Sequence, residues 1–258
     1  MENMKTLIVI PARYASTRFP GKPLARLGGE SIIGRVWHTA AMMAGAGRVV
    51  VATDDERILT HVRSIGGDEA AMMTSTAHRS GTDRCGEVLR RLKERGEGYD
   101  VVVNIQGDEP FVEQRQIEAL TACFADGGCD IATLRTPIRS TAELLSPNNV
   151  KVVCGDNGQA LYFSRQPIPY RRDVAPEAWL DGAAYYKHVG IYAFRGEVLE
   201  KLCTLPQAPL EECEKLEQLR WLSAGYRITV RDTEHANIGI DTPEDLAEAE
   251  AWLAQHQK

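Results

Sequence analysis

Short apolar runs alternate with helix-like patterns through the first half of the chain. Each run is short enough for one buried strand. Strands separated by helices of this length predict βαβ units and a mostly parallel sheet with helices on both faces. The predicted strands of this half are Thr6–Ile10, Arg48–Thr53, Ala70–Thr74, Val101–Ile105 and Asp130–Thr136.

Helix signals lie between these runs. Ser31 is placed to cap a helix whose apolar face begins with Ile32 and Ile33, and Asp54 or Asp55 can cap the next helix, which ends at Gly66. The same reasoning predicts helices over Asp83–Arg95 and Glu113–Ala125.

The second half is less regular. The turn sequence Gly155-Asp156-Asn157-Gly158 predicts a hairpin, and a long irregular stretch runs from Pro167 through Tyr186. The elements expected here are strands at Lys151–Cys154, Ala160–Ser164, His188–Phe194 and Arg227–Arg231, an amphipathic helix at Glu211–Ala224 and a helix from Pro243 onward. We therefore predict a single domain over residues 1–258, with an inserted antiparallel subdomain at about residues 137–194.

Composition narrows the classes of function. The chain has 258 residues, 43% of them hydrophobic, and a formal net charge of −6, which argues against a broad surface for DNA or RNA. The six cysteines form no CxxC pair, so we expect reduced thiols and no zinc site. The apolar run Leu7–Ile10 is too short for a signal peptide or a membrane span, so we expect a soluble, cytoplasmic protein with no membrane insertion.

The segment IPARYASTRFPGKPL follows the first predicted strand, at the sheet edge where open α/β folds bind ligands. Its small residues let backbone N–H groups approach phosphate oxygens, and its cations offset phosphate charge. It has neither a GxGxxG nor a GxxxxGKS pattern. An ordinary arginine-rich surface loop is the competing interpretation. The small residues are Ala12, Ala15, Ser16 and Gly21, and the cations are Arg13, Arg18 and Lys22.

Two further segments offer carboxylates. The strand in VVVNIQGDEPF delivers Gln106 and Asp108 to the same sheet edge, where Asp108 is either a magnesium ligand or a turn residue. Asp241 in GIDTP precedes a helix, so its local sequence favours a simple N-cap. Paired with Asp108, it becomes a second candidate metal carboxylate. His188 is equally compatible with a half-buried strand residue and with a substrate donor.

Taken together, these segments resemble the 3-deoxy-manno-octulosonate (Kdo) cytidylyltransferase family over nearly the whole chain. The matching segments are IPARYASTRFPGKPL, VATDDERI, SGTDR, NIQGDEP, ALYFSRQPIP, KHVGIYAF, ECEKLEQLR and IDTPEDL. The loop between Arg171 and Tyr185 follows no pattern of the family that we can match.

The resemblance implies a Rossmann-like nucleotidyltransferase fold, a homodimer and Mg²⁺ as the cofactor. It assigns CTP phosphates to Arg13 and Lys22, and the metal to Asp108 and Asp241, so these four are the candidate catalytic residues. The remaining assignments are Ala12, Arg79, Ser80, Thr82 and Gln106 for the nucleotide, and Gln106, Arg165, His188, Tyr192, Glu217 and Gln218 for the sugar.

The reaction that the resemblance implies is transfer of CMP from CTP to the anomeric hydroxyl of Kdo, with release of pyrophosphate, for lipopolysaccharide biosynthesis. Such a transfer depends on positioning and charge neutralisation more than on covalent help from the protein. We expect Mg²⁺ on Asp108 and Asp241 to activate the hydroxyl, and Lys22 with Arg13 to stabilise the leaving pyrophosphate.

Three other functions remain open at this point. A related cytidylyltransferase for sialic acid or 8-amino-Kdo would use the same phosphate loop. A non-catalytic nucleotide-binding module would keep the fold, although binding alone needs no aligned metal carboxylates. A nicotinamide dehydrogenase is disfavoured, because GxGxxG is missing after the first strand.

Overall fold

The structure is a computed structural model that describes residues 4–15, 18–43, 47–235 and 239–256. The chain forms two compact units. The first contains Met1–Ile117 and Asn237–Lys258, and the second contains Glu118–Ala236. The second unit includes the whole range predicted for the inserted subdomain.

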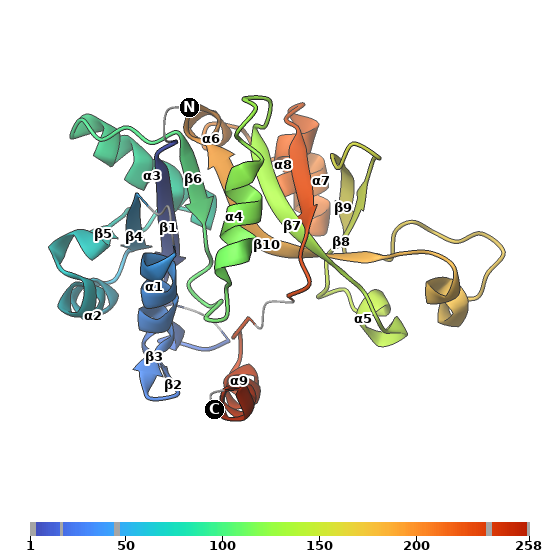
Figure 1. The fold of residues 1–258 in the computed structure, drawn as a ribbon, viewed down its shortest axis with the longest axis horizontal. Coiled ribbons are helices and arrows are strands. Elements are labelled where there is room, and N and C mark those ends of the chain that lie inside the picture. Colours follow the sequence, from blue (N-terminus) through green and yellow to red (C-terminus); the bar gives the residue numbers. More distant parts are fainter. Residues whose placement is uncertain (1–3, 16–17, 44–46, 236–238, 257–258) are drawn as a thin grey trace. The chain divides into compact units, whose positions relative to one another are not determined.

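The first unit is built on four parallel strands in the order β6-β1-β4-β5 (Figure 1). Valine, isoleucine and leucine fill β1 and β6, whose hydrophobic side chains are fully buried, as expected for strands covered on both faces. The predicted strands are confirmed with small shifts of their ends. Their bounds are Thr6–Ala12 (β1), Arg48–Thr53 (β4), Ala71–Met73 (β5) and Val101–Asn104 (β6).

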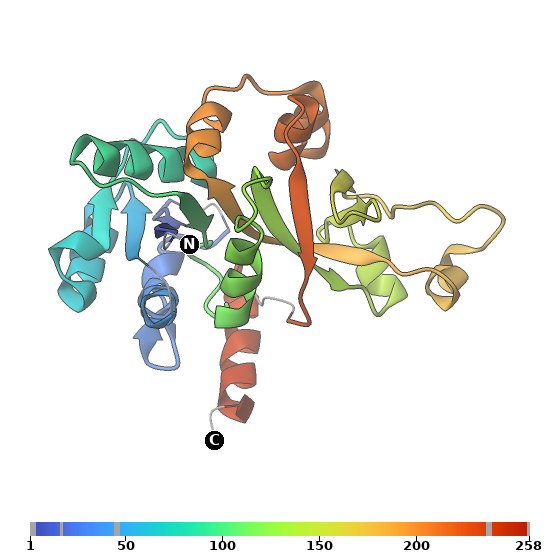
Figure 2. The same cartoon turned by 45° about the horizontal axis from the view of Figure 1, so that its top comes forward.

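Helices cover both faces of these strands. In Figure 2, α3 (Gly81–Glu94) lies on one side of β4 and β5, and α1 (Ile32–Met42) and α2 (Glu56–Gly66) lie on the other. The predicted cap Ser31 accepts a hydrogen bond from the Gly34 N–H, and Asp55 rather than Asp54 caps α2. The chain moves from β1 through β4 to β5 and then returns across β1 to β6. This reversal creates a topological switch point at the carboxyl ends of β1 and β6, where open α/β sheets bind ligands.

The C-terminal segment belongs to the first unit. Helix α9 (Pro243–His256) packs Ala249 and Leu253 against Leu27 and Ile32 in one apolar cluster. Leu27 lies in a two-stranded hairpin, β2 (Arg26–Leu27) and β3 (Glu30–Ser31), which the sequence did not predict. Short 3₁₀ turns complete the unit at η1 (Lys22–Leu24) and η2 (Asp68–Ala70).

The second unit is mainly antiparallel. Strand β10 (Tyr186–Arg195) pairs antiparallel with β7 (Ile131–Pro137) and β8 (Lys151–Cys154), and β8 continues into β9 (Ala160–Ser164) through the predicted hairpin. Strand β11 (Ile228–Asp232) pairs parallel with β7. The expected fold class, a mostly parallel sheet with helices on both faces and an antiparallel insertion, is confirmed.

The predicted helix Glu211–Ala224 was wrong as a single element. Lys215 adopts a left-handed conformation with φ of 54°, which separates α7 (Pro209–Glu214) from α8 (Gln218–Ser223). The irregular stretch contains a 3₁₀ turn, η3 (Pro176–Asp181), in which Arg171 donates to the Ala178 and Trp179 carbonyls. The other helices are α4 (Gln114–Ala122), α5 (Thr141–Leu145) and α6 (Gly196–Leu202). Within the described ranges, no helix has the length and apolarity that crossing a bilayer requires.

Candidate active site

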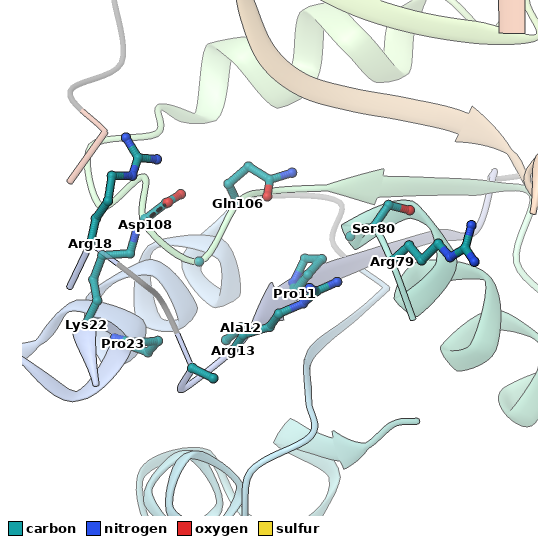
Figure 3. A pocket seen from close by; sticks show the side chains of 13 residues that line it. Pro11, Ala12, Arg13, Arg18, Lys22, Pro23, Arg79, Ser80, Gln106 and Asp108 are labelled. Atoms are coloured by element: carbon teal, nitrogen blue, oxygen red, sulfur yellow. Dashed lines mark hydrogen bonds and ion pairs between the residues drawn. The ribbon is translucent and has the colours of Figure 1, made fainter. Parts of the chain in front are cut away.

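A cavity of about 420 Å³ lies at the switch point of the first unit. The loop after β1 and the loop after β6 form two of its walls, and the start of α3 forms a third. In Figure 3, Lys22 and Asp108 lie toward one end, Arg79 and Ser80 toward the other, and Ala12 with Arg13 between them. Its lining residues are Pro11, Ala12, Arg13, Ala15, Arg18, Lys22, Pro23, Arg79, Ser80, Gly81, Gln106, Gly107 and Asp108.

Two glycines allow the backbone to take this shape. A Cβ on Gly107 would lie 2.8 Å from the Pro11 carbonyl oxygen, so only glycine lets the loop after β6 approach the end of β1 this closely. Gly21 has φ of 74° and immediately precedes η1, the turn that carries Lys22. The two loops therefore bring their polar side chains to one edge of the sheet.

Lys22 joins the two predicted metal carboxylates. Its Nζ lies 2.6 Å from Asp108 Oδ2 and 3.1 Å from Asp241 Oδ1. Arg18 reaches the other oxygen of Asp241 at 3.0 Å. The Lys22 side chain is buried, whereas those of Asp108 and Asp241 are 31% and 47% exposed, so the carboxylates remain accessible from solvent. Asp108 and Asp241, which lie 86 and 219 positions after Lys22 in the sequence, thus both contact its ammonium group.

Asp241 is held by the chain around it and does not cap α9. The Thr242 hydroxyl accepts the Asp245 N–H, so Thr242 is the N-cap, and the Asp245 carboxylate accepts the Asp241 and Thr242 N–H groups. Burial raises the pKa of Asp245, but these hydrogen bonds outweigh it and bring the pKa below its usual range. The Ile240 N–H donates to the Asp108 carbonyl at 3.0 Å. These contacts leave the Asp241 carboxylate free to face Lys22.

The opposite end of the cavity is formed by the start of α3. Ser80 caps this helix by accepting the Asp83 N–H, and Asp83 reciprocates at the Ser80 N–H. Arg13 donates to the His78 carbonyl at 2.8 Å, which ties the loop after β1 to the segment before α3. The first turn of a helix carries partial positive charge and open N–H groups, both of which favour phosphate or carboxylate groups.

The donor set fits Mg²⁺ better than a transition metal. Asp108 and Asp241 converge on one cation, and Mg²⁺ needs only one or two carboxylates besides water and phosphate oxygens. No three His, Cys, Asp or Glu side chains gather into a metal cluster in the part of the chain that the structure describes. The Lys22 ammonium lies where the two carboxylates would share a metal ion.

The residues predicted to bind the sugar, apart from Gln106, lie in the second unit. The rings of His188 and Tyr192 on β10 are 5.3 Å apart, and Tyr192 packs edge-on against Trp221 of α8. Burial lowers the pKa of His188 well below its usual range, so its ring is neutral and shares a 3.0 Å hydrogen bond with the Thr133 hydroxyl. Burial, and then the charge of Glu217, raise the pKa of Tyr192. Gln218 is buried at the start of α8.

Arg165 makes most of its polar contacts with the backbone. Its guanidinium donates to the carbonyls of Glu214, Pro147 and Lys215, at 2.7, 3.0 and 3.5 Å. The Glu214 carboxylate in turn accepts the Arg165 N–H and the Ser164 hydroxyl. Arg165 therefore holds the turn that separates α7 from α8.

Most predicted residues of the first unit line one cavity, with four exceptions. Gly21 precedes the turn that carries Lys22 and is not among the lining residues. Asp241 contacts the lining residues Lys22 and Arg18. Thr82 is buried in the first turn of α3 and is not among the lining residues. Ser16 lies outside the described residues. Sequence reasoning noted Arg18 as a cation but missed its pairing with Asp241, for which the chain offers no local signal.

Comparisons with known proteins agree with this geometry. A model of the cytidylyltransferase family matches residues 7–228. The chain is 53% identical to the 3-deoxy-manno-octulosonate cytidylyltransferase of Phocaeicola vulgatus, over 98% of this chain and 99% of that protein. It is 51% identical to the corresponding enzyme of Parabacteroides distasonis, over 97% and 99% of the two chains.

Solved structures extend the likeness to three dimensions. The structure of CMP:2-keto-3-deoxy-manno-octonic acid synthetase complexed with CTP has a TM-score of 0.88 and 43% identity, over 97% of this chain and 99% of that one. A 4-diphosphocytidyl-2C-methyl-D-erythritol synthase from Anaerococcus prevotii shares the fold alone, with a TM-score of 0.61 and 16% identity over 98% and 97% of the chains. The chain is a cytidylyltransferase and belongs to the 3-deoxy-manno-octulosonate cytidylyltransferase family.

Proposed function

We propose that this chain transfers CMP from CTP to the anomeric hydroxyl of Kdo and releases pyrophosphate, supplying CMP-Kdo for lipopolysaccharide. The observation that carries the proposal is the junction of Lys22, Asp108 and Asp241 beside a cavity of nucleotide-binding size at the switch point. The relatives named for this reaction support the nucleotide and the sugar, and the related structure contains CTP.

CTP occupies the cavity of the first unit in this proposal. Lys22 and Arg13 take the phosphates, and the first turn of α3 adds the partial positive charge of its N–H groups. Ala12, Arg79, Ser80 and Gln106 surround the rest of the nucleotide. Lys22 exchanges its two carboxylate contacts for phosphate oxygens, which places its charge where the leaving pyrophosphate develops its own.

Asp108 and Asp241 would hold Mg²⁺, as the donor set allows. The bound ion would supply charge neutralisation at the α-phosphate and lower the pKa of the attacking hydroxyl. Asp108 is the only carboxylate, and no histidine is present, among the described residues that line the cavity. The described lining therefore offers no dedicated general base, since its one carboxylate would hold the metal.

The family resemblance assigns the sugar to six residues, which are Gln106, Arg165, His188, Tyr192, Glu217 and Gln218. Neutral His188 and the Tyr192 ring suit a polyhydroxylated sugar, because they offer hydrogen bonds and an apolar face without adding charge. The family resemblance supports this half of the proposal.

The decisive experiment measures pyrophosphate release from CTP and Mg²⁺, with Kdo, 8-amino-Kdo and sialic acid offered in parallel against a blank without sugar. We expect release with Kdo, and loss of release when EDTA removes the metal. Release only with another sugar keeps the reaction and changes its acceptor. Folded protein that binds CTP but releases no pyrophosphate with any sugar supports the binding module instead.

We further propose a cytoplasmic homodimer. The family resemblance supports both statements. Light scattering of the purified chain should give twice the 28.5 kDa mass of one chain, and a single-chain mass at micromolar concentration contradicts the dimer.

A further inference from the structure

One face of α3 holds the loop that leads into the cavity of the first unit. This loop, residues 74–80, connects β5 to α3, and its last two residues line the cavity (Figure 3). Asp83, Glu87 and Arg91 are spaced four residues apart, so their side chains form a row along the helix. The row runs beside the loop in the opposite direction, because Arg91 contacts the start of the loop and Asp83 its end.

The two ends of the loop are fixed to the row through the backbone. At the start, the Arg91 guanidinium donates to the carbonyl of Met73, the last residue of β5. At the end, the Asp83 carboxylate accepts the N–H groups of Arg79 and Ser80, at 3.3 and 3.2 Å. Because these contacts use only backbone groups of the loop, they fix where it begins and ends without depending on its side chains.

The middle of the loop depends on one pair of side chains. Glu87 Oε2 accepts the Ser75 N–H at 2.9 Å and lies 2.5 Å from His78 Nε2, and Arg91 contacts the other oxygen of Glu87 at 3.3 Å. Burial raises the pKa of Glu87, but these hydrogen bonds and charges outweigh it and bring the pKa below its usual range. The ionised carboxylate can only accept hydrogen bonds, so His78 Nε2 carries the proton between them.

His78 connects this pair to the phosphate-binding candidate Arg13. The ring of His78 is held by Glu87, and its carbonyl accepts a hydrogen bond from Arg13 Nη2 at 2.8 Å. The guanidinium has five N–H donors in a rigid fork, so a carbonyl on one nitrogen fixes the direction of the others. Among the described contacts of Arg13, the donors of the other two nitrogens remain for a ligand.

We propose that His78 and Glu87 are positioning residues for the nucleotide. Their contact sets the conformation of a loop whose residues 75–77 are exposed and therefore receive little support from packing. The loop in turn directs Arg13 through the His78 carbonyl and places its last two residues on the cavity wall. In the proposed function, on which this inference rests, Arg13 and the end of the loop contact CTP. His78 and Glu87 thus set the affinity for CTP through the loop.

The test measures CTP binding to the full-length chain by titration calorimetry, and the KM values for CTP and Kdo in the pyrophosphate assay. We expect His78→Ala and Glu87→Ala each to weaken CTP binding and to raise the KM for CTP about fivefold to tenfold, with the KM for Kdo unchanged. The double variant should lose no more than Glu87→Ala, because both changes break the same contact. The matched control is Glu94→Ala, which removes an exposed acid of the same helix and should leave CTP binding unchanged.

Two milder variants separate a displaced loop from a damaged fold. His78→Gln should stay within about twofold of the unmodified chain, since its amide N–H can replace Nε2. Glu87→Gln keeps an oxygen for the Ser75 N–H but removes the charge, and should weaken CTP binding about threefold. In calorimetry, an unfolded fraction lowers the number of CTP sites per chain, whereas a displaced loop weakens binding at the sites that remain.

Unchanged CTP affinity in the alanine variants, or an equal rise in the KM for CTP and for Kdo, overturns the positioning role. The proposed function fails separately, when the unmodified chain binds no CTP or releases no pyrophosphate with any sugar.

Discussion

Lys22 and Arg18 at the cavity of the first unit contact carboxylates, whereas Arg165 and Lys151 of the second unit contact backbone carbonyls. Lys22 and Arg18 both pair with Asp241, whose side chain is partly exposed. Arg165 instead spans three carbonyls, and the fully buried Lys151 donates to the carbonyls of Ser146, Asn149 and Arg165.

The two kinds of contact differ in the free energy that is needed to break them. The Asp108 and Asp241 carboxylates are partly exposed and can be solvated by water, so Lys22 can exchange them for anionic oxygens of a ligand at small cost. A buried cation on carbonyls is harder to move, because its removal leaves polar groups without partners. The cavity is therefore suited to exchanging charged partners during a reaction. In the second unit, Arg165 and Lys151 instead fix the conformation of the backbone around them.

Removing a cavity carboxylate should give the largest effect. We expect Asp108→Asn and Asp241→Asn each to lower turnover by at least about 10³-fold, because each removes a carboxylate that would hold the metal. Pyrophosphate release at saturating Kdo and CTP measures this loss. The matched control is Asp173→Asn, since that exposed acid pairs only with its neighbour Arg172 in the described contacts. Near-normal turnover in either cavity variant removes that residue from the metal site.

Lys22→Met should separate the two functions of Lys22. We expect turnover to fall on the order of 10²-fold, since a charge that opposes the leaving pyrophosphate is lost. In the absence of CTP, however, Mg²⁺ should bind more tightly than to the unmodified chain, because no ammonium competes for Asp108 and Asp241. Titration calorimetry with Mg²⁺ alone measures this difference. Weaker Mg²⁺ binding contradicts the competition.

The same contrast explains how far the sequence could predict this molecule. Apolar runs predicted β1, β4 and β6, because a strand that is buried on both faces consists almost entirely of hydrophobic residues. The motifs at the strand ends predicted most of the cavity, because the loops that follow parallel strands meet at one edge of the sheet. The pairing of Arg18 with Asp241 depends on where α9 packs, which no local pattern encodes.

The break at Lys215 was missed for a related physical reason. The apolar spacing continues through this residue, and no glycine marks the left-handed turn. Arg165, some 50 residues earlier in the chain, donates to the carbonyls of Glu214 and Lys215 and stabilises the turn by tertiary contact. A tertiary interaction thus overrides a local helical pattern.

Arg165→Gln and Glu214→Gln should test whether Arg165 positions the turn or contacts the sugar. If it positions Glu217 and Gln218, both variants raise the KM for Kdo roughly tenfold, about 1.4 kcal/mol, and leave the KM for CTP unchanged. Both should also lose about 1–2 kcal/mol of stability in urea unfolding, because carbonyls or hydrogen-bond donors lose their partners. Arg172→Gln is the exposed control. A raised KM in Arg165→Gln alone assigns Arg165 to direct sugar contact.

Lys215→Gly should have the smallest effect and the opposite sign. A non-glycine residue in the left-handed region costs about 1 kcal/mol or more, while the added glycine also makes the unfolded chain more flexible. We expect a net gain of up to about 0.5 kcal/mol in the free energy of unfolding, because the Lys215 carbonyl that accepts from Arg165 is retained. Lys201→Gly, on the exposed side of α6, is the matched control and should lose about 1 kcal/mol, as glycine does in a helix. Equal losses in the two variants would mean that the turn is not strained, and that Arg165 holds a conformation the chain already prefers.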